Sequence, residues 1–217
     1  MRRISLRGGN FMGQPFAYDN SMDVVILDAA PVSRSYYAAD FDPSKTVAPT
    51  CWSSTTQTPD ADVPEEQVQS RRCMDCKQNV RGSSGSNGRA CRFSQRLAVA
   101  PAQKLDEVYQ IQLPATSIFG KTVKGNMPMQ EYARLLAQNN TQAASIVTKM
   151  YFDEYSAVSK LYFKPVRSLD KQEVTVVSQT KDHPDTKEAI TLIIIDQSAG
   201  SSPFGITEGY EHNPNHS

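Results

Sequence analysis

The sequence predicts a mainly β (α+β) fold, a small β-barrel or mixed domain interrupted by a cysteine-rich insert. Short runs rich in β-branched and aromatic residues recur along the chain, whereas few stretches have helical periodicity. All four cysteines fall in one polar segment. We therefore expect four parts: a flexible basic arm at 1–20, a core domain at 21–196, an insert within it at about 45–96, and a flexible C-terminal tail at 197–217.

The first half of the chain alternates between apolar runs and polar, irregular stretches. The arm is rich in Gly, Asn and Phe and begins with Arg2, Arg3 and Arg7. Residues 42–72 are rich in Pro, Thr, Ser and Asp, and we expect no regular structure there. Four runs predict strands: 23–27, 32–38, 96–100 and 107–113.

The second half predicts one helix and a hairpin. Pro128 opens a helical stretch with Tyr132, Leu135 and Leu136 on one face, and Asn139 ends it. Residues 145–153 and 159–166 are two β-rich runs joined by a short polar link, which is typical of a hairpin. Residues 169–179 start like a capping box but contain many β-branched residues, so helix and strand both stay open. The run at 191–195 is apolar enough to be buried.

Length and charge indicate an ordinary globular protein. The chain has 217 residues with 23 Lys+Arg and 23 Asp+Glu, so only local charge is informative. No apolar run approaches the ~20 residues that span a bilayer. The basic N-terminus lacks the apolar stretch of a secretory signal. We therefore expect a soluble, intracellular protein without membrane partners.

The four cysteines have the spacing C-x21-C-x2-C-x14-C. Two thiolates on a CxxC turn can reach one tetrahedral ion, and the outer cysteines would complete four ligands. The spacing therefore predicts a structural zinc site at Cys51, Cys73, Cys76 and Cys91. A redox pair is the alternative, but nothing helical follows Cys76. Cys51 could also be simply buried or pair elsewhere.

The insert is locally basic and carries aromatic residues. Positions 71 to 96 contain seven cationic side chains and only one carboxylate. In the sequence, Trp52 directly follows one cysteine and Phe93 lies two residues after another. Cations that follow phosphates and rings that stack on bases are what single-stranded nucleic acid requires. A merely solvated charged face is the alternative.

The predicted hairpin offers a second basic and aromatic surface. Alternation places Val147, Lys149 and Tyr151 on one face of its first strand, opposite Met150 and Phe152. If the register aligns the two strands, one patch forms from Lys149, Tyr151, Lys160, Tyr162 and Lys164. Solubilising lysines on an amphipathic sheet are the alternative. Arg34, Tyr36 and Tyr37 could extend this surface.

The sequence does not suggest an enzyme. Only His183 lies outside the tail, so Ser/His/Asp catalysis would depend on that one histidine. The GSSGSNG stretch (82–88) follows no predicted strand and opens no helix, so it is a weak phosphate cradle. Acidic residues are scattered over loops, and a two-metal nuclease would need them to converge.

With these features in place, the chain resembles phage single-stranded DNA-binding proteins. A barrel interrupted by a cysteine-rich zinc lobe is similar to the helix-destabilising protein of T-even phages, an OB-fold with zinc in an inserted subdomain. The strings RSYYAADFDPSKTVAPTCWSS, NVRGSSGSNGRACRFSQRLAV and IVTKMYFDEYSAVSKLYFKP also resemble a recurrent pattern in phage proteins of similar size. The T-even site includes a histidine, and this module has none.

The resemblance implies an OB-like barrel with zinc at the four cysteines, and a protein that coats single-stranded DNA in phage replication or recombination. Implied partners are single-stranded DNA, further copies of the chain through the basic arm, and replication proteins, in the cytoplasm of the infected bacterial host. The acidic tail typical of such proteins is not matched. The alternative is a zinc-stabilised structural or adaptor protein of a phage. The residues we expect to contact DNA are Arg34, Tyr36, Tyr37, Trp52, Lys77, Arg81, Arg89, Arg92, Phe93, Arg96, Lys149, Tyr151, Lys160, Tyr162 and Lys164.

Overall fold

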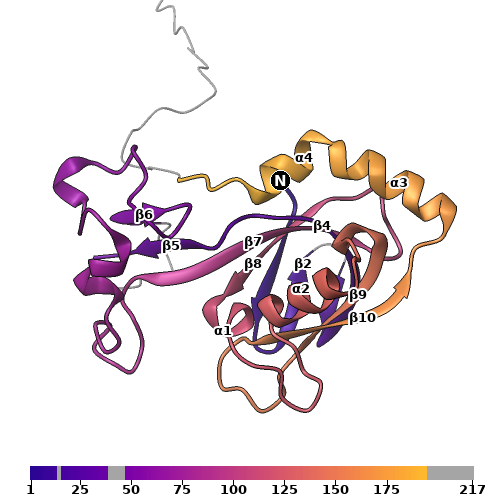
Figure 1. Cartoon of the computed structure of the whole chain (residues 1–217), viewed down its shortest axis with the longest axis horizontal. Helices are drawn as coiled ribbons and strands as arrows, with labels where there is room; N and C mark the ends of the chain where they lie inside the picture. Colours follow the sequence, from indigo (N-terminus) through magenta and orange to yellow (C-terminus); the bar gives the residue numbers. More distant parts are fainter. Residues whose placement is uncertain (14–15, 39–46, 195–217) are drawn as a thin grey trace, which may run out of the picture.

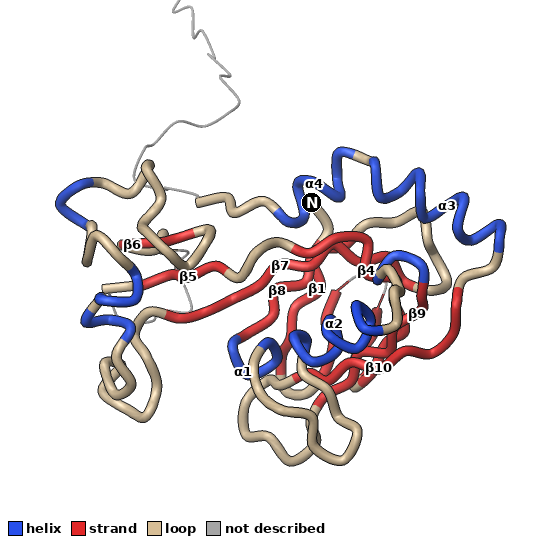
Figure 2. Tube along the Cα trace, viewed as in Figure 1, coloured by secondary structure: helices blue, strands red, loops and turns tan. Residues whose placement is uncertain are grey.

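The computed structural model describes residues 1–13, 16–38 and 47–194. The protein is mainly β, with a curled sheet that forms an open half-barrel and few helices (Figures 1 and 2). The sheet order is β10-β9-β4-β7-β8-β1-β2-β3, and β5 and β6 continue from β7 outside this path. Its strands are β1 (Arg3–Arg7), β2 (Asn10–Gly13), β3 (Phe16–Asp19), β4 (Ser21–Ala29), β5 (Ser33–Tyr36), β6 (Cys51–Ser53), β7 (Arg92–Pro101), β8 (Tyr109–Pro114), β9 (Ile146–Phe152) and β10 (Leu161–Ser168).

Helices cover the two faces of the sheet. On one face lie α1 (Ala115–Ile118) and α2 (Met129–Gln138), and on the other α3 (Lys171–Asp182) and α4 (Pro184–Ile190) (Figure 1). The larger core lies under α1 and α2 and includes Ile26, Leu97, Ile111, Met150 and Phe163. A smaller one lies under α3 and α4 and includes Val25, Leu27, Ala98, Ala100 and Val147. Alternate residues of each central strand therefore enter opposite cores.

Most of the predicted elements are confirmed. The apolar runs at 23–27, 32–38, 96–100 and 107–113 lie in β4, β5, β7 and β8, and the expected hairpin is β9 and β10. Pro128 caps α2 and Asn139 ends it, with Tyr132 and Leu136 buried. The ambiguous segment is α3, whose start at Asp170 and Glu173 is a complete capping box. That cap and the burial of Val177 outweigh the β-branched residues.

The N-terminal residues correct our expectation of a flexible arm. Strand β1 pairs parallel with β8 and antiparallel with β2, so this segment belongs to the sheet. Ile4 and Phe11 are 3% and 1% exposed in the larger core. Their burial fixes the segment, while Arg3 and Arg7 alternate with them and stay exposed.

The cysteines lie where the sheet extends beyond the half-barrel through β5, β6 and the first part of β7. The first residues of β7 pair with β5, which pairs with β6, whereas the later residues of β7 pair with β4. We call residues 47–91 together with β5 the cysteine lobe, which Figure 1 shows beside the half-barrel. Apart from β5 and β6, it contains only three short 3-10 turns: Glu65–Gln67, Cys73–Asp75 and Lys77–Asn79.

The segment after α4 also differs from expectation. Residues 191–194 form no strand and are only partly buried, with Ile193 53% exposed. Leu192 and Ile194 instead pack against Trp52 and Val63 in the cysteine lobe. The predicted flexible tail at 197–217 lies outside the described residues. Within them, no helix is long and apolar enough to cross a membrane.

Candidate nucleic-acid interface

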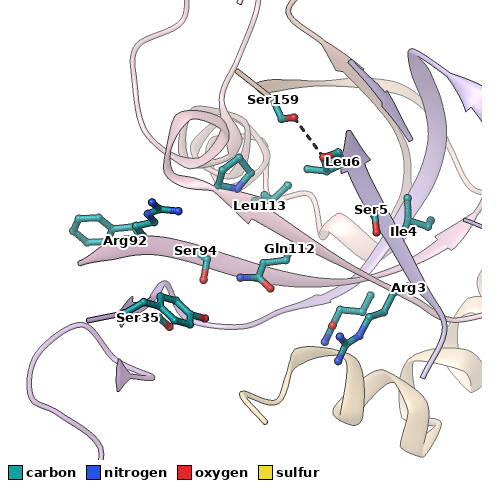
Figure 3. A pocket seen from close by; sticks show the side chains of 14 residues that line it. Arg3, Ile4, Ser5, Leu6, Ser35, Arg92, Ser94, Gln112, Leu113 and Ser159 are labelled. Carbon is teal, nitrogen blue, oxygen red and sulfur yellow. Dashed lines mark hydrogen bonds between the residues drawn. The ribbon is translucent and has the colours of Figure 1, made fainter. Parts of the chain in front are cut away.

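A groove of about 510 Å³ opens where β1 separates from β8. The two strands pair only through Arg3 with Gln110 and Ile4 with Ile111. Beyond that point they diverge, and β5 and β7 form the other side of the opening (Figure 3). The groove is lined by Arg3, Ile4, Ser5, Leu6, Ser35, Tyr37, Arg92, Phe93, Ser94, Gln110, Gln112, Leu113, Pro114 and Ser159.

The lining of the groove combines positive charge with neutral polar groups. Arg92 and Arg3 lie toward opposite ends, with Ser94 and Gln112 between them (Figure 3). Of the lining residues that the structure describes, none is a carboxylate. Tyr37 adds an aromatic ring that is 44% exposed. The groove thus offers donors and a stacking surface to an anionic, aromatic ligand.

Arg96 lies beside this groove and is only 8% exposed. It pairs across the sheet with Gln112, a lining residue. Burial, and then the charge of Arg3, lower the pKa of Arg96, while Tyr37 raises it. Among the described residues, no hydrogen bond or carboxylate satisfies the Arg96 side chain. The Arg96 nitrogens are not among the buried, unpartnered atoms of the described side chains, so the guanidinium stays accessible to solvent or to an anion.

Arg34 is 4% exposed and is engaged inside the protein. Its guanidinium lies 4.2 Å from the centre of the Phe93 ring, and Nη1 donates to the Cys73 carbonyl oxygen at 3.3 Å. The edge of Phe93 meets Phe119, with 5.2 Å between ring centres. Arg34 therefore joins β5 to the cysteine turn, and it covers one face of a predicted stacking residue.

The remaining candidates of the lobe divide into exposed cations and enclosed rings. Lys77, Arg81 and Arg89 are exposed, and Arg89 Nε donates to the Asn79 carbonyl oxygen at 2.7 Å. Trp52 is 7% exposed and its Nε1 donates to Asp62 at 3.1 Å. Tyr36 is half-buried. The cations are free to meet a polyanion, whereas these two rings pack inside the lobe.

The hairpin register aligns the predicted patch as expected. Lys164 pairs with Lys149 and Tyr162 with Tyr151, whose ring centres are 5.9 Å apart. Carboxylates offset much of this charge. Asp153 accepts hydrogen bonds from both Lys160 and Tyr162 at 3.0 Å.

The other partners on this face reduce its free charge further. Lys149 lies 3.6 Å from Asp23, and Tyr162 is only 8% exposed. Lys164 is exposed, with its Nζ 5.3 Å from the centre of the Tyr151 ring. The patch exists as a surface but is less positive than the groove.

All four cysteines are buried, unbridged thiols. They line one cavity of about 20 Å³ together with Tyr36 and Trp52. Burial, followed by neighbouring thiols, raises the pKa of Cys51, and burial raises that of Cys91 to about 11. As the described side chains stand, no three or more His, Cys, Asp or Glu are arranged to hold a metal.

The four thiols surround one cavity, although as they stand no three of them are placed to hold a metal among the described residues. Four soft sulfur donors around one small space suit zinc. Side-chain rotations would still have to bring the thiols into ligating positions. The donor set therefore fits the metal chemically.

Comparison with known proteins adds no relative. The chain matches no protein-family model, no curated protein and no solved structure.

The structure also brings residues to the groove that our sequence analysis did not select. Gln110 and Gln112 alternate in β8, and Ser94 lies opposite Pro114 at its end. The signal was present, since polar residues at alternate positions of EVYQIQL mark one face of a strand. The sequence did not indicate that Arg3, which we had assigned to a flexible arm, pairs with Gln110.

Proposed function

We propose that this protein binds single-stranded DNA in the groove between β1, β8, β7 and β5. The observation that carries the proposal is a 510 Å³ groove lined by Arg3, Arg92 and Tyr37, with no carboxylate among the described residues that line it. The chain as a whole has equal numbers of cations and anions, so this local separation of charge is informative. Lys77, Arg81 and Arg89 on the lobe would extend the positive path.

The mechanism is capture of the backbone combined with base stacking. Arg3 and Arg92 neutralise phosphates and release their counterions, which makes binding fall steeply with salt. Tyr37 stacks on a base, a contact that contributes about 1–3 kcal/mol and tolerates every base. Ser94 and Gln112 offer hydrogen bonds to sugars or bases without selecting a sequence.

We further propose that Cys51, Cys73, Cys76 and Cys91 hold a structural zinc ion. The proposal is supported by the cavity that the four thiols share. Bound zinc would supply a cross-link between distant loops and no catalytic step. Cys51 begins β6 and Cys91 precedes β7, so this link would fix the lobe against one wall of the groove.

The proposed biological role is coating of single strands during phage replication or recombination. It is supported by the resemblance to phage single-stranded DNA-binding proteins and by the open half-barrel, which we propose is OB-like. Such barrels bind oligonucleotides on a strand face beside loops. We propose no enzymatic activity.

A labelled oligo-dT titrated with protein tests this function by fluorescence anisotropy at low and moderate salt, with a duplex of equal length as control. We expect tighter binding to the single strand. Arg92→Gln should lower the slope of log K against log salt by about one. Tyr37→Ala should weaken binding with the slope unchanged. Arg134→Gln, on α2, is the matched control. A flat salt dependence would contradict the proposal.

One observation favours the alternative of an adaptor protein. Met74 and Val80 on the lobe are 66% and 60% exposed, which suits contact with another protein. Charge reversal at Arg81, Arg89 and Arg92 separates the two functions. In a DNA-binding protein the reversal abolishes oligonucleotide binding. In an adaptor, DNA binding is absent from the start, and the reversal changes partner capture instead.

A further inference from the structure

One face of the small sheet in the cysteine lobe brings a buried cation beside two of the cysteines. Arg34 in β5 pairs with Ser53 in β6 and with Phe93 in β7. Cys51 precedes Ser53 by two residues, and Cys91 precedes Phe93 by two. Because alternate side chains of a strand share a face, Cys51 lies on the face that carries Arg34, and Cys91 adjoins this face where β7 begins.

The Arg34 guanidinium also contacts the CxxC turn directly. The residue is 4% exposed, and its Nη1 donates to the carbonyl oxygen of Cys73 at 3.3 Å. Burial raises the pKa of the Cys91 thiol, and the positive charge of Arg34 lowers it. Three of the four cysteines thus lie close to one buried positive charge.

Two polar atoms at this position have no partner of their own. Arg34 Nε and Ser53 Oγ are both buried without a hydrogen-bond partner among the described residues. Leaving a buried donor without an acceptor is costly, and the cost is larger for a charged group. This face of the lobe therefore offers two donors to a group that accepts hydrogen bonds, as a thiolate sulfur does.

A zinc ion held by four thiolates would leave an excess of negative charge in the lobe. The four thiolates outweigh the two positive charges of the ion, so the site as a whole is anionic. Burying an anionic group is costly unless a counter-charge lies beside it. Loss of a group that supports the ligands typically weakens metal binding by about 10–100-fold.

We infer that Arg34 is the counter-charge of the zinc–thiolate site, with its unpartnered Nε free to donate to a ligating sulfur and Ser53 Oγ as a second donor. The inference rests on the proposed zinc site, because it assigns a role toward that metal to residues outside the four ligands. Arg34 is thus a positioning residue: it holds the turn at Cys73 and offsets the charge of the thiolates.

Zinc titrations of the full chain against a chromophoric chelator of known affinity test the inference. Arg34→Met keeps an apolar stem beside Phe93 but removes the charge, and we expect it to bind zinc about 10–100-fold more weakly than the wild type. Arg34→Lys loses the same planar contacts but keeps the charge, so it should recover much of that affinity. The matched control is Arg72→Met, because Arg72 directly precedes Cys73 but is exposed and pairs with Asp75. This control should keep the wild-type affinity.

Cobalt in place of zinc gives a readout that a merely structural role would not move. Cobalt bound by thiolates has a sulfur-to-metal charge-transfer band, whose energy rises when a neighbouring cation stabilises the sulfur electrons. Arg34→Met should therefore move this band to longer wavelength, and Arg34→Lys should move it less. Because Arg34 is buried, the Met variant could fail to fold; Arg34→Gln, which can still donate to the Cys73 carbonyl oxygen, then gives the charge-free reading.

The outcomes separate this inference from the proposed zinc site. Equal zinc affinity in the wild type and in every Arg34 variant would overturn the counter-charge role and leave the site intact. An affinity of Arg34→Lys as low as that of Arg34→Met would overturn it too, since loss of the planar contacts alone would then explain the effect. An unmoved cobalt band in Arg34→Met would have the same meaning. A wild type that binds neither zinc nor cobalt would remove the site together with the inference.

Discussion

At the scale of single residues, two buried arginines have opposite surroundings. Arg34 stacks on Phe93 and donates to the Cys73 carbonyl oxygen and to the sulfur of Met74 at 3.7 Å. Arg96 makes no such contact with the described residues; none of its nitrogens is buried without a partner, whereas Arg34 Nε is. Burial by itself therefore does not separate a structural arginine from a binding one. The contacts do, and they give Arg34 a role in stability.

Replacing Arg34 with Lys should destabilise the protein by about 2 kcal/mol, because an ammonium cannot reproduce the planar stacking or the fork of hydrogen bonds. Urea unfolding measures the loss. Arg92→Lys, on the neighbouring strand but at an exposed position, should leave the urea midpoint unchanged. An unaltered midpoint for Arg34→Lys would show that its contacts contribute nothing to the fold.

At the scale of elements, the start of α3 shows how a cap decides an ambiguous sequence. Asp170 accepts from the backbone nitrogens of Gln172 and Glu173, and Glu173 accepts from that of Asp170. Arg167 in β10 donates to both Glu173 oxygens at 2.7 Å, which joins the helix to the sheet. These bonds, that of Arg167 foremost, lower the pKa of Glu173 from 4.5 to about 2.

This lowered pKa predicts an acid-sensitive helix start. Because the folded pKa lies below the ordinary value, the stabilisation is present above pH 4.5 and is lost as pH falls toward about 2. Urea unfolding across that range should show the loss in the wild type and a smaller loss in Glu173→Gln. Glu66→Gln, in an exposed turn, should retain the wild-type loss. Identical profiles for both variants would contradict the role of Glu173.

At the scale of the whole molecule, the half-barrel and the cysteine lobe are joined at several places. Strand β7 runs through both, and Leu192 and Ile194 after α4 pack against Trp52 and Val63 in the lobe. Since the groove lies between β1 of the half-barrel and β5, its width depends on how firmly the lobe is held. A zinc ion bound to the cysteines would hold the lobe more rigidly beside the groove.

Removing zinc should therefore loosen the lobe and leave the half-barrel folded. Cys76→Ser, or a chelator on the wild type, should shift the fluorescence of Trp52, the only tryptophan, while far-ultraviolet dichroism changes little. Elemental analysis should find a zinc ion in the wild type and none in Cys76→Ser. A zinc-free wild type that is indifferent to chelator would refute the metal site.

Much of the fold could be predicted because its signals are local. The run of β4 is continuously apolar, apolar and polar residues alternate along β8, and Pro128 and Asn139 mark the ends of α2. The hairpin was expected from two β-rich runs joined by a short polar link, whereas its register, assumed in the sequence analysis, came from the structure. The burial expected of the run at 191–195 is not seen at 191–194, where Ile193 is exposed and Leu192 and Ile194 pack against the lobe rather than in a continuous core.

The sequence alone therefore determined the mainly β character, the order of most elements and the clustering of four cysteines, all of which depend on neighbouring residues. Only the tertiary structure decided that β1 completes the sheet and brings Arg3 beside Arg96 and Gln112, or that Arg34 and Trp52 lie inside. The physical reason is that pairing between distant strands depends on burying every apolar face at once, and no local period specifies which strand will lie at an edge.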